Sequence, residues 1–224
     1  MHTIRVWDLP TRLCHWALAL CVVALLITGN IGGNWMDWHL RFGYAVLSLL
    51  LFRVVWGIVG GRWSRFSSFL YSPSTVWGYL KGNVRPEHTV GHNPLGALAV
   101  FALLAVLLAQ VGSGLMSDDE IAYFGPLVAY VSGETVSQAT SYHKNIGKFV
   151  VLGLVVLHLV AIAFYKLVKK ESLVRPMLVG DKHLLNSMPG SQDTWITRLF
   201  ALVVFLSCAA AVYTSVALAR ASTF

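Results

Sequence analysis

Five long apolar stretches divide the sequence, and each is bounded by polar residues. They cover approximately residues 12–30, 39–59, 95–116, 143–168 and 196–218. Each is long enough to supply the roughly 20 helical residues that cross a hydrocarbon core of about 30 Å. None shows the alternation of a barrel strand, and backbone polar groups cannot stay unpaired in lipid, so each stretch is predicted to be a helix. The pattern predicts an all-α integral membrane protein without a soluble domain.

Composition and charge agree with this pattern. Of 224 residues, 56% are hydrophobic and 12% charged, and the mean hydropathy is +0.65, which is unusual for a soluble domain. The chain has 17 Lys plus Arg against 10 Asp plus Glu. In a soluble protein this excess would suggest nucleic acid, but here most basic residues fall on one side of the predicted spans. The positive-inside rule then predicts a cytoplasmic N-terminus and a periplasmic C-terminus, with lipid rather than nucleic acid as the surroundings.

Two connections between spans carry further signals. Ser72, Pro73 and Gly82 are placed like the start and end of a short capped helix, and a helix lying on the inner membrane surface is favoured over a functional one. The longest outer connection covers residues 117–142 and begins with three consecutive acidic residues. It is either a docking surface for an external partner or a solvated acidic loop.

Four histidines lie within predicted spans, where an ionisable side chain is costly and indicates function. His15 begins an outward-running helix near the inner face, and His39 begins the next helix near the outer face. His143 enters the fourth span from outside, and His158 lies about 22 Å deeper at 1.5 Å per residue. The depths therefore predict two pairs, His39 with His143 near the outer face and His15 with His158 near the inner face.

Two histidines on facing helices at one depth are suited to binding the iron of a flat macrocycle from both sides, which favours two haems. Fifteen helical residues return a side chain to within about 60° of its first direction, so both histidines of the fourth span can face one interior. Gly43 and Gly147 follow two of these histidines by four residues and would leave room beside a haem. Gly29 is expected at the level of the outer pair. The alternative is that each histidine is only a hydrogen-bonded helix residue.

Three other charged or titratable positions leave alternatives open. Arg53 is expected at the level of the inner pair, where it would bind a haem propionate or a quinone, or else pair with a protein group or reach the inner surface. His88 and His92 are spaced to chelate a metal on a helix. A Gly-His-Asn-Pro sequence around His92 breaks that helix, so both are favoured as loop residues.

Several motifs occur together over residues 3–170, and with them the chain resembles the bacterial cytochrome b561 family, which includes the b-type cytochrome subunits of nickel-iron hydrogenases. The motifs are Val6-Trp7-Asp8-Leu9-Pro10-Thr11-Arg12 leading into His15-Trp16, Thr28-Gly29, Arg53 with Trp56-Gly57, Gly91-His92-Asn93-Pro94-Leu95-Gly96, Gly125-Pro126-Leu127, and the paired His143 and His158.

The resemblance implies a four-helix bundle that binds two haems b, with His15, His39, His143 and His158 as ligands of the haem iron. Residues 1–170 would form this di-haem domain, and residues 171–224 a cytoplasmic connection and a fifth, C-terminal transmembrane helix. Electrons would pass, in a bacterial inner membrane, between a quinone and a periplasmic redox partner such as a c-type cytochrome or a hydrogenase-like subunit. Lys144, where many members have an acidic residue, and the fifth span depart from the family pattern.

Two other functions compete with an electron-transfer subunit. A stand-alone superoxide:quinone oxidoreductase is similar to short single-subunit members, although the acidic outer loop does not favour attraction of an anionic substrate. A metal transporter is disfavoured because such proteins usually have broken helices or carboxylates at mid-membrane, and these spans have neither.

Overall fold

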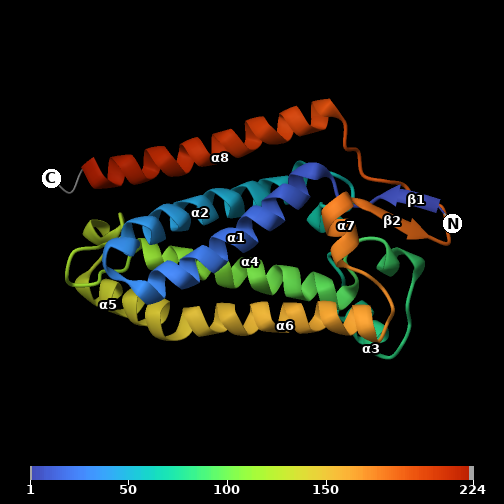
Figure 1. Ribbon diagram of the computed structural model, residues 1–224, viewed down its shortest axis with the longest axis horizontal. Coiled ribbons are helices and arrows are strands. Elements are labelled where there is room, and N and C mark those ends of the chain that lie inside the picture. Colours follow the sequence, from blue (N-terminus) through green and yellow to red (C-terminus); the bar gives the residue numbers. More distant parts are fainter. Residues whose placement is uncertain (1, 222–224) are drawn as a thin grey trace. The chain divides into compact units, whose positions relative to one another are not determined.

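The computed structural model describes residues 2–221 and contains five helices long and apolar enough to cross a membrane (Figure 1). The predicted all-α integral membrane fold is therefore confirmed. These spans are Leu9–Ile31 (α1), Gly33–Val59 with α2 at Met36–Val59, Pro94–Leu115 (α4), Gly133–Leu167, and Trp195–Ala221 (α8).

Serine caps begin two of the short helices. The Ser72 hydroxyl accepts a hydrogen bond from the backbone N–H of Thr75 at 3.2 Å and begins α3, Pro73–Leu80, which confirms the predicted short helix. Ser132 begins α5, Gly133–Ser141, in the same way. The remaining short helix is α7, Val174–Val179, and four 3-10 turns lie at Gly33–Trp35, Phe66–Ser68, Pro86–Thr89 and Val128–Tyr130.

The fourth span contains a π-helical turn that the hydropathy pattern did not indicate. It covers Tyr142–Gly147 and joins α5 to α6, Lys148–Leu167. A π turn has an i to i+5 hydrogen-bond pattern and is frequently found at functional sites. It widens the helix where His143 lies and changes the direction of the side chains that follow.

The chain divides into two compact units. The first unit contains the residues up to His15, Arg53–Ala102 and Val156–Val204, and the second contains Trp16–Phe52, Leu103–Val155 and the chain from Phe205 onward. The first unit contains His15 and His158, and the second contains His39 and His143.

In the second unit, four helices share one apolar core and α8 lies outside it. The core residues are Val22 of α1, Val46 and Leu50 of α2, Leu107 and Val111 of α4, and Val151 of α6. Phe205 of α8 packs on Phe52 with ring centroids 6.0 Å apart, and Arg220 donates a hydrogen bond to the Tyr44 hydroxyl at 3.2 Å. The expected fifth helix thus contacts α2 within this unit.

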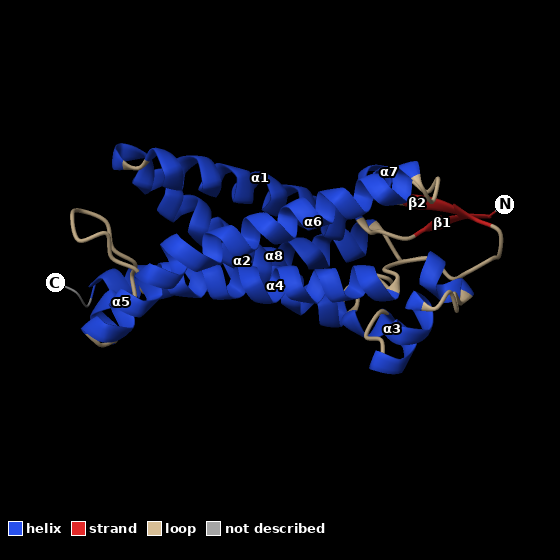
Figure 2. Cartoon of the chain, turned by 90° about the horizontal axis from the view of Figure 1, so that it is seen from below, coloured by secondary structure: helices blue, strands red, loops and turns tan. Residues whose placement is uncertain are grey.

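The first unit contains a two-stranded antiparallel ribbon that was not predicted. Strand β1, His2–Arg5, pairs with β2, Asp181–Leu184, in a register that places Arg5 opposite Asp181 (Figure 2). Beyond the ribbon, the backbone N–H groups of Val6 and Trp7 both donate to the carbonyl of Gly180, at 2.9 and 3.1 Å. The N-terminal segment is therefore fixed before α1 begins.

Asp193 fixes the segment before α8 to the same ribbon. Its carboxylate accepts hydrogen bonds from Arg198 at 2.8 Å and Arg5 at 3.2 Å, and Arg12 lies 3.9 Å away. Burial opposes ionisation of Asp193, but the hydrogen bonds and charge of its arginine partners outweigh burial and lower its pKa. The carboxylate is thus kept ionised, and it neutralises part of a strongly basic region.

Asp8 is a second buried junction in the first unit and lies immediately before α1. One carboxylate oxygen accepts from the Thr11 N–H at 2.8 Å and from the Trp56 indole N–H at 3.3 Å. The other accepts from the Gly61 N–H at 3.1 Å and the Ser64 hydroxyl at 3.0 Å. This side chain therefore caps the first turn of α1 and ties it to the end of α2 and the loop that follows.

Candidate functional site

The second unit brings His39 and His143 together. Their ring centroids lie 6.1 Å apart and their planes are nearly perpendicular, at 89°. Both side chains are partly buried. His39 comes from α2 and His143 from the π turn, so the two imidazoles approach each other from different helices.

The Nδ1 edge of each ring is fixed by a backbone carbonyl of a neighbouring helix. His39 Nδ1 lies 3.1 Å from the carbonyl of Leu25, and His143 Nδ1 lies 2.9 Å from that of Gln110. Because a carbonyl can only accept, each Nδ1 carries the hydrogen and each Nε2 keeps its lone pair. Metal-ligating imidazoles have this arrangement, since the bond from the other ring nitrogen sets tautomer and direction.

A hydroxyl–glycine dipeptide receives each of these rings. Thr28-Gly29 on α1 and Ser113-Gly114 on α4 both place a hydroxyl oxygen 3.3 Å from the Nδ1 of the neighbouring imidazole. A Cβ atom at Gly29 would lie 2.9 Å from the ring, and one at Gly114 would lie 2.8 Å from it. Both glycines also follow the carbonyl acceptor by four residues. In a helix a Cβ at that position lies over the carbonyl, so glycine leaves the acceptor accessible.

The glycines predicted to make room for a macrocycle have different surroundings. A Cβ at Gly43 would meet no atom of residues 2–221 within 4 Å, so the space beside it is open. Gly147 is buried, and a Cβ there would collide with the side-chain oxygen of Gln110 and lie 2.9 Å from the Tyr142 ring. Gly147 ends the π turn and faces the Gln110 side chain of α4, a contact that the four-residue spacing did not indicate. A role beside a cofactor stays a prediction for both.

The first unit brings together the other two histidines. The rings of His15 on α1 and His158 on α6 have centroids 6.3 Å apart and an interplanar angle of 53°. Both residues are partly buried. Arg53 belongs to the same unit and is buried, with its Nη1 donating to the Ser64 carbonyl at 3.1 Å and its guanidinium 4.9 Å from the centre of the Phe66 ring. A protein group therefore takes one of its five N–H donors.

Both pairs fit one metal ion between two imidazoles. With metal–nitrogen bonds of about 2.0 Å, two imidazoles on opposite sides of an ion have ring centroids about 6 Å apart. The measured separations of 6.1 and 6.3 Å agree with this value. Within residues 2–221, no group of three or more His, Cys, Asp and Glu could hold an ion. Such two-histidine sites suit a metal whose other ligands come from a macrocycle.

His88 and His92 lie in the connection before α4, as predicted, but they are not solvated loop residues. His88 is buried in the 3-10 turn Pro86–Thr89, where its Nδ1 accepts from the backbone N–H of Arg85 at 3.2 Å. The His92 ring lies between Trp7 and Phe69, with centroid distances of 4.7 and 4.5 Å. Their helix-breaking neighbours indicated the loop, but gave no sign of burial.

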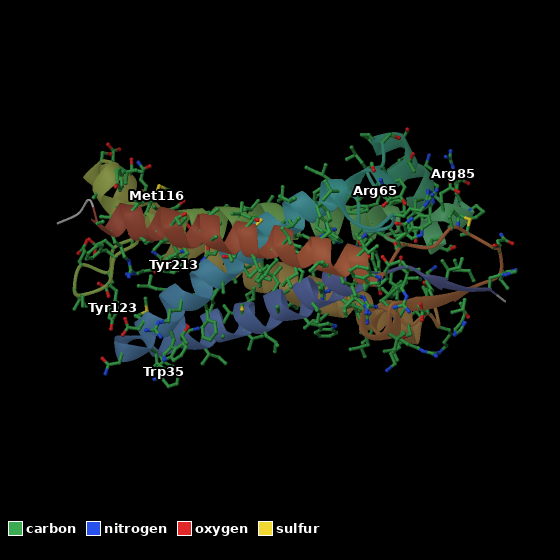
Figure 3. The ribbon with its side chains drawn as sticks, turned by 90° about the horizontal axis from the view of Figure 1, so that it is seen from above. Trp35, Arg65, Arg85, Met116, Tyr123 and Tyr213 are labelled. Atoms are coloured by element: carbon green, nitrogen blue, oxygen red, sulfur yellow. The ribbon has the colours of Figure 1, made fainter. Side chains whose placement is uncertain are left out.

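The acidic segment after α4 is an ordered loop in the second unit. Asp119 accepts hydrogen bonds from the backbone N–H groups of Ile121, Ala122 and Tyr123, each at 2.9 Å, and these bonds lower its pKa although desolvation opposes them. Figure 3 shows Tyr123 on this loop. Ile121 is 90% exposed. The loop thus presents an apolar side chain among acidic ones.

Comparison with known proteins gives a consistent result. The model of the family described as prokaryotic cytochrome b561 matches residues 6–180. The chain is 27% identical to a probable Ni/Fe-hydrogenase B-type cytochrome subunit of Azotobacter vinelandii, covering 83% of this chain and 91% of the relative. It is 24% identical to the corresponding subunit of Bradyrhizobium diazoefficiens (80% and 86%), and 26% identical to the probable Ni/Fe-hydrogenase 1 B-type cytochrome subunit of Escherichia coli K12 (78% and 88%). The chain therefore belongs to the prokaryotic cytochrome b561 family and is a multi-pass membrane cytochrome of the b type.

Proposed function

We propose that this cytochrome carries electrons across the bacterial inner membrane between the quinone pool and a hydrogenase-like periplasmic partner, through two haems b. His39 and His143 would hold the iron of one haem, and His15 and His158 would hold that of the other. The observation that supports this most directly is the presence of two histidine pairs with separations of 6.1 and 6.3 Å. The haem, when bound, supplies the reversible one-electron chemistry.

The protein's own contribution is ligation and orientation. The carbonyls of Leu25 and Gln110 hold the Nδ1–H groups of His39 and His143, which directs each Nε2 lone pair toward the space between the rings. Such outer hydrogen bonds also raise the basicity of the ligating imidazole and favour the oxidised metal. The open space beside Gly43 is available to part of the macrocycle.

The charge distribution supports the proposed orientation of the termini. The second unit holds only four of the 17 basic residues, Arg41, Lys144, Lys148 and Arg220, together with the acidic residues Asp37, Asp118, Asp119, Glu120 and Glu134. The positive-inside rule then places the N-terminus in the cytoplasm and the C-terminus in the periplasm. Figure 3 shows Arg65 and Arg85, two basic residues of the first unit.

The periplasmic partner is inferred from two features. The relatives are named as cytochrome subunits of Ni/Fe-hydrogenases, which favours a hydrogenase-like partner over a c-type cytochrome. The exposed Ile121 lies beside Glu120 on the acidic loop. An apolar residue that follows three consecutive acidic residues suits a partner with a complementary basic surface.

The proposal is tested by the spectrum and haem content of the purified full chain. We expect the dithionite-reduced protein to show b-type bands and the pyridine haemochrome to give two haems per chain. Addition of a quinol should reduce these haems without dithionite. A chain that carries no haem b, or no more than one when fully loaded, would contradict the di-haem proposal.

The hydroxyl–glycine dipeptide on α4 gives a second prediction. Gly114→Ala should displace the His143 ring, because the added Cβ would lie 2.8 Å from it, and the haem content should fall from two toward one per chain. Gly112→Ala is the matched control two residues earlier on the same helix, since a Cβ there meets no atom of residues 2–221 within 4 Å. Equal haem contents in both variants would show that the ring does not depend on this glycine.

A further inference from the structure

His92 is held rigidly in the first unit although none of the roles above uses it. Its ring lies between the rings of Trp7 and Phe69, with interplanar angles of 53° and 55°. Its backbone carbonyl accepts a hydrogen bond from the Tyr71 hydroxyl at 2.9 Å. The next residue, Asn93, caps α4 by accepting from the Gly96 N–H at 2.8 Å. Both the ring and the backbone of His92 therefore have little freedom to move.

The Nδ1 atom of this ring is buried, and no group within residues 2–221 forms a hydrogen bond with it. Buried polar groups in folded proteins are nearly always hydrogen-bonded, and one that is not requires an explanation. The neighbouring His88 does not share this property, because its Nδ1 accepts from the Arg85 N–H. An imidazole fixed by aromatic rings, with a buried nitrogen left over, is suited to receive a polar atom of a ligand.

The surroundings indicate which kind of atom would bind. Burial first, and then the charges of Arg53, His15 and His158, lower the pKa of His92 to about 3. Whether neutral or protonated, an imidazole carries at least one N–H, so His92 can donate a hydrogen bond. Arg53 adds a guanidinium that can donate several hydrogen bonds and accept none. The two donors lie along one aromatic row, because the Arg53 guanidinium packs 4.9 Å from the centre of the Phe66 ring, Phe66 lies 5.9 Å from Phe69, and Phe69 contacts His92. Two donors in the unit that also holds His15 and His158 favour an oxygen acceptor.

We propose that His92 and Arg53 together bind an oxygen acceptor of the ligand at the His15–His158 pair, with the Nδ1–H of His92 donating to it. The acceptor is either a haem propionate carboxylate or a quinone carbonyl, since both oxygens are recognised by the same donors. This inference rests on the proposed function, because it takes the His15–His158 pair as a haem site. In this proposal His92 binds an oxygen of the ligand and does not bind the iron.

The two sources of the oxygen have different consequences. A propionate that loses a hydrogen-bond donor has a less compensated negative charge, which stabilises the ferric haem and lowers its potential. If the acceptor is a quinone carbonyl, loss of the donor weakens quinone binding and leaves the potential of the haem unchanged. The midpoint potential and the quinone affinity together therefore identify the acceptor.

The experiment uses the full, haem-loaded chain with His92→Phe, which keeps an aromatic ring between Trp7 and Phe69 and removes the nitrogens. His92→Gln returns an N–H donor, and His88→Gln is the control four residues earlier. The haem content of each variant is measured first, by pyridine haemochrome. Redox titration then gives the two midpoint potentials, and ubiquinol and menaquinol titrations of haem reduction give the quinone affinities.

We expect His92→Phe to keep two haems and to show one of two changes. A propionate acceptor gives a tenfold shift in one haem's redox equilibrium, about 59 mV for one electron, and a quinone acceptor gives about a tenfold loss of quinol affinity. His92→Gln should restore most of either change, and His88→Gln should resemble the wild type. If His92→Phe is not haem-loaded, Arg53→Gln, which removes donors of the other residue, is titrated in its place and should show the same kind of change. Unaltered potentials and affinities overturn the inference, whereas a wild-type chain without two haems overturns the proposed function instead.

Discussion

Replacing His39 or His143 with alanine is expected to remove the same haem and leave one haem per chain. Each proposed site has two histidines, and the rings of this pair are 6.1 Å apart, so loss of either would leave the iron with one protein ligand. His15→Ala and His158→Ala should likewise share the loss of the other haem. Pyridine haemochrome gives the number of haems, and the low-temperature α-band or the low-spin ferric signals show which one is lost.

Double variants test which histidines form a pair. The double variant His39→Ala/His143→Ala should contain as much haem as either single variant, whereas His39→Ala/His158→Ala should contain none. His183→Ala is the control, because this histidine lies on β2 with its Nδ1 next to the Thr3 hydroxyl at 2.9 Å. Crossed losses, such as the same haem missing from His39→Ala and His158→Ala, would refute the assignment.

The helical framework follows from local sequence alone. Runs of apolar residues predicted the five spans to within a few residues, except for the start of the fourth, which begins ten residues before the predicted position, at Gly133. The agreement arises because a helix in lipid must satisfy its own backbone. Ser72 likewise marked the start of α3, because a serine cap acts on the next three residues only. These features depend on neighbours in the chain, so they needed no knowledge of packing.

Two elements that depend on distant contacts were missed. The ribbon pairs Arg5 with Asp181, and nothing near either strand indicates a partner so far along the chain. The strands are only four residues long, too short for a pattern of alternation. The π turn at Tyr142–Gly147 is also set by tertiary contacts, such as the bond from the Gln110 side chain to the His143 carbonyl at 3.1 Å.

The candidate site also combines features that local sequence predicts with features that depend on distant contacts. Spacing and depth were sufficient to expect that His39 would lie near His143 and His15 near His158, because helical rise is constant. The hydrogen bonds that fix the rings come from other helices, at Leu25 and Gln110, and therefore required the packed structure. A sequence signal does exist, since a hydroxyl residue followed by glycine occurs three and four residues after each acceptor carbonyl.

Asp8→Ala is expected to lower the stability of the chain and to remove the haem proposed at His15. The carboxylate is 1% exposed and accepts hydrogen bonds from four groups that would then lack an acceptor. A buried donor left unsatisfied costs about 1 to 3 kcal/mol. Partial relaxation around the new cavity would limit the total to about 3 to 5 kcal/mol. Thermal unfolding in detergent and pyridine haemochrome measure the two effects.

The haem at the His15 pair should be lost selectively, because Asp8 caps the first turn of α1, the helix that carries His15 in the first unit. Asp8→Asn is an informative second variant. It keeps the volume of the side chain but turns an NH2 group toward donors such as the Gly61 N–H, so it should lower stability nearly as much as alanine. Asp119→Ala is the control, since this carboxylate accepts three backbone N–H bonds in an outer loop of the second unit. Equal haem contents in the Asp8 and Asp119 variants would show that the cap does not position His15.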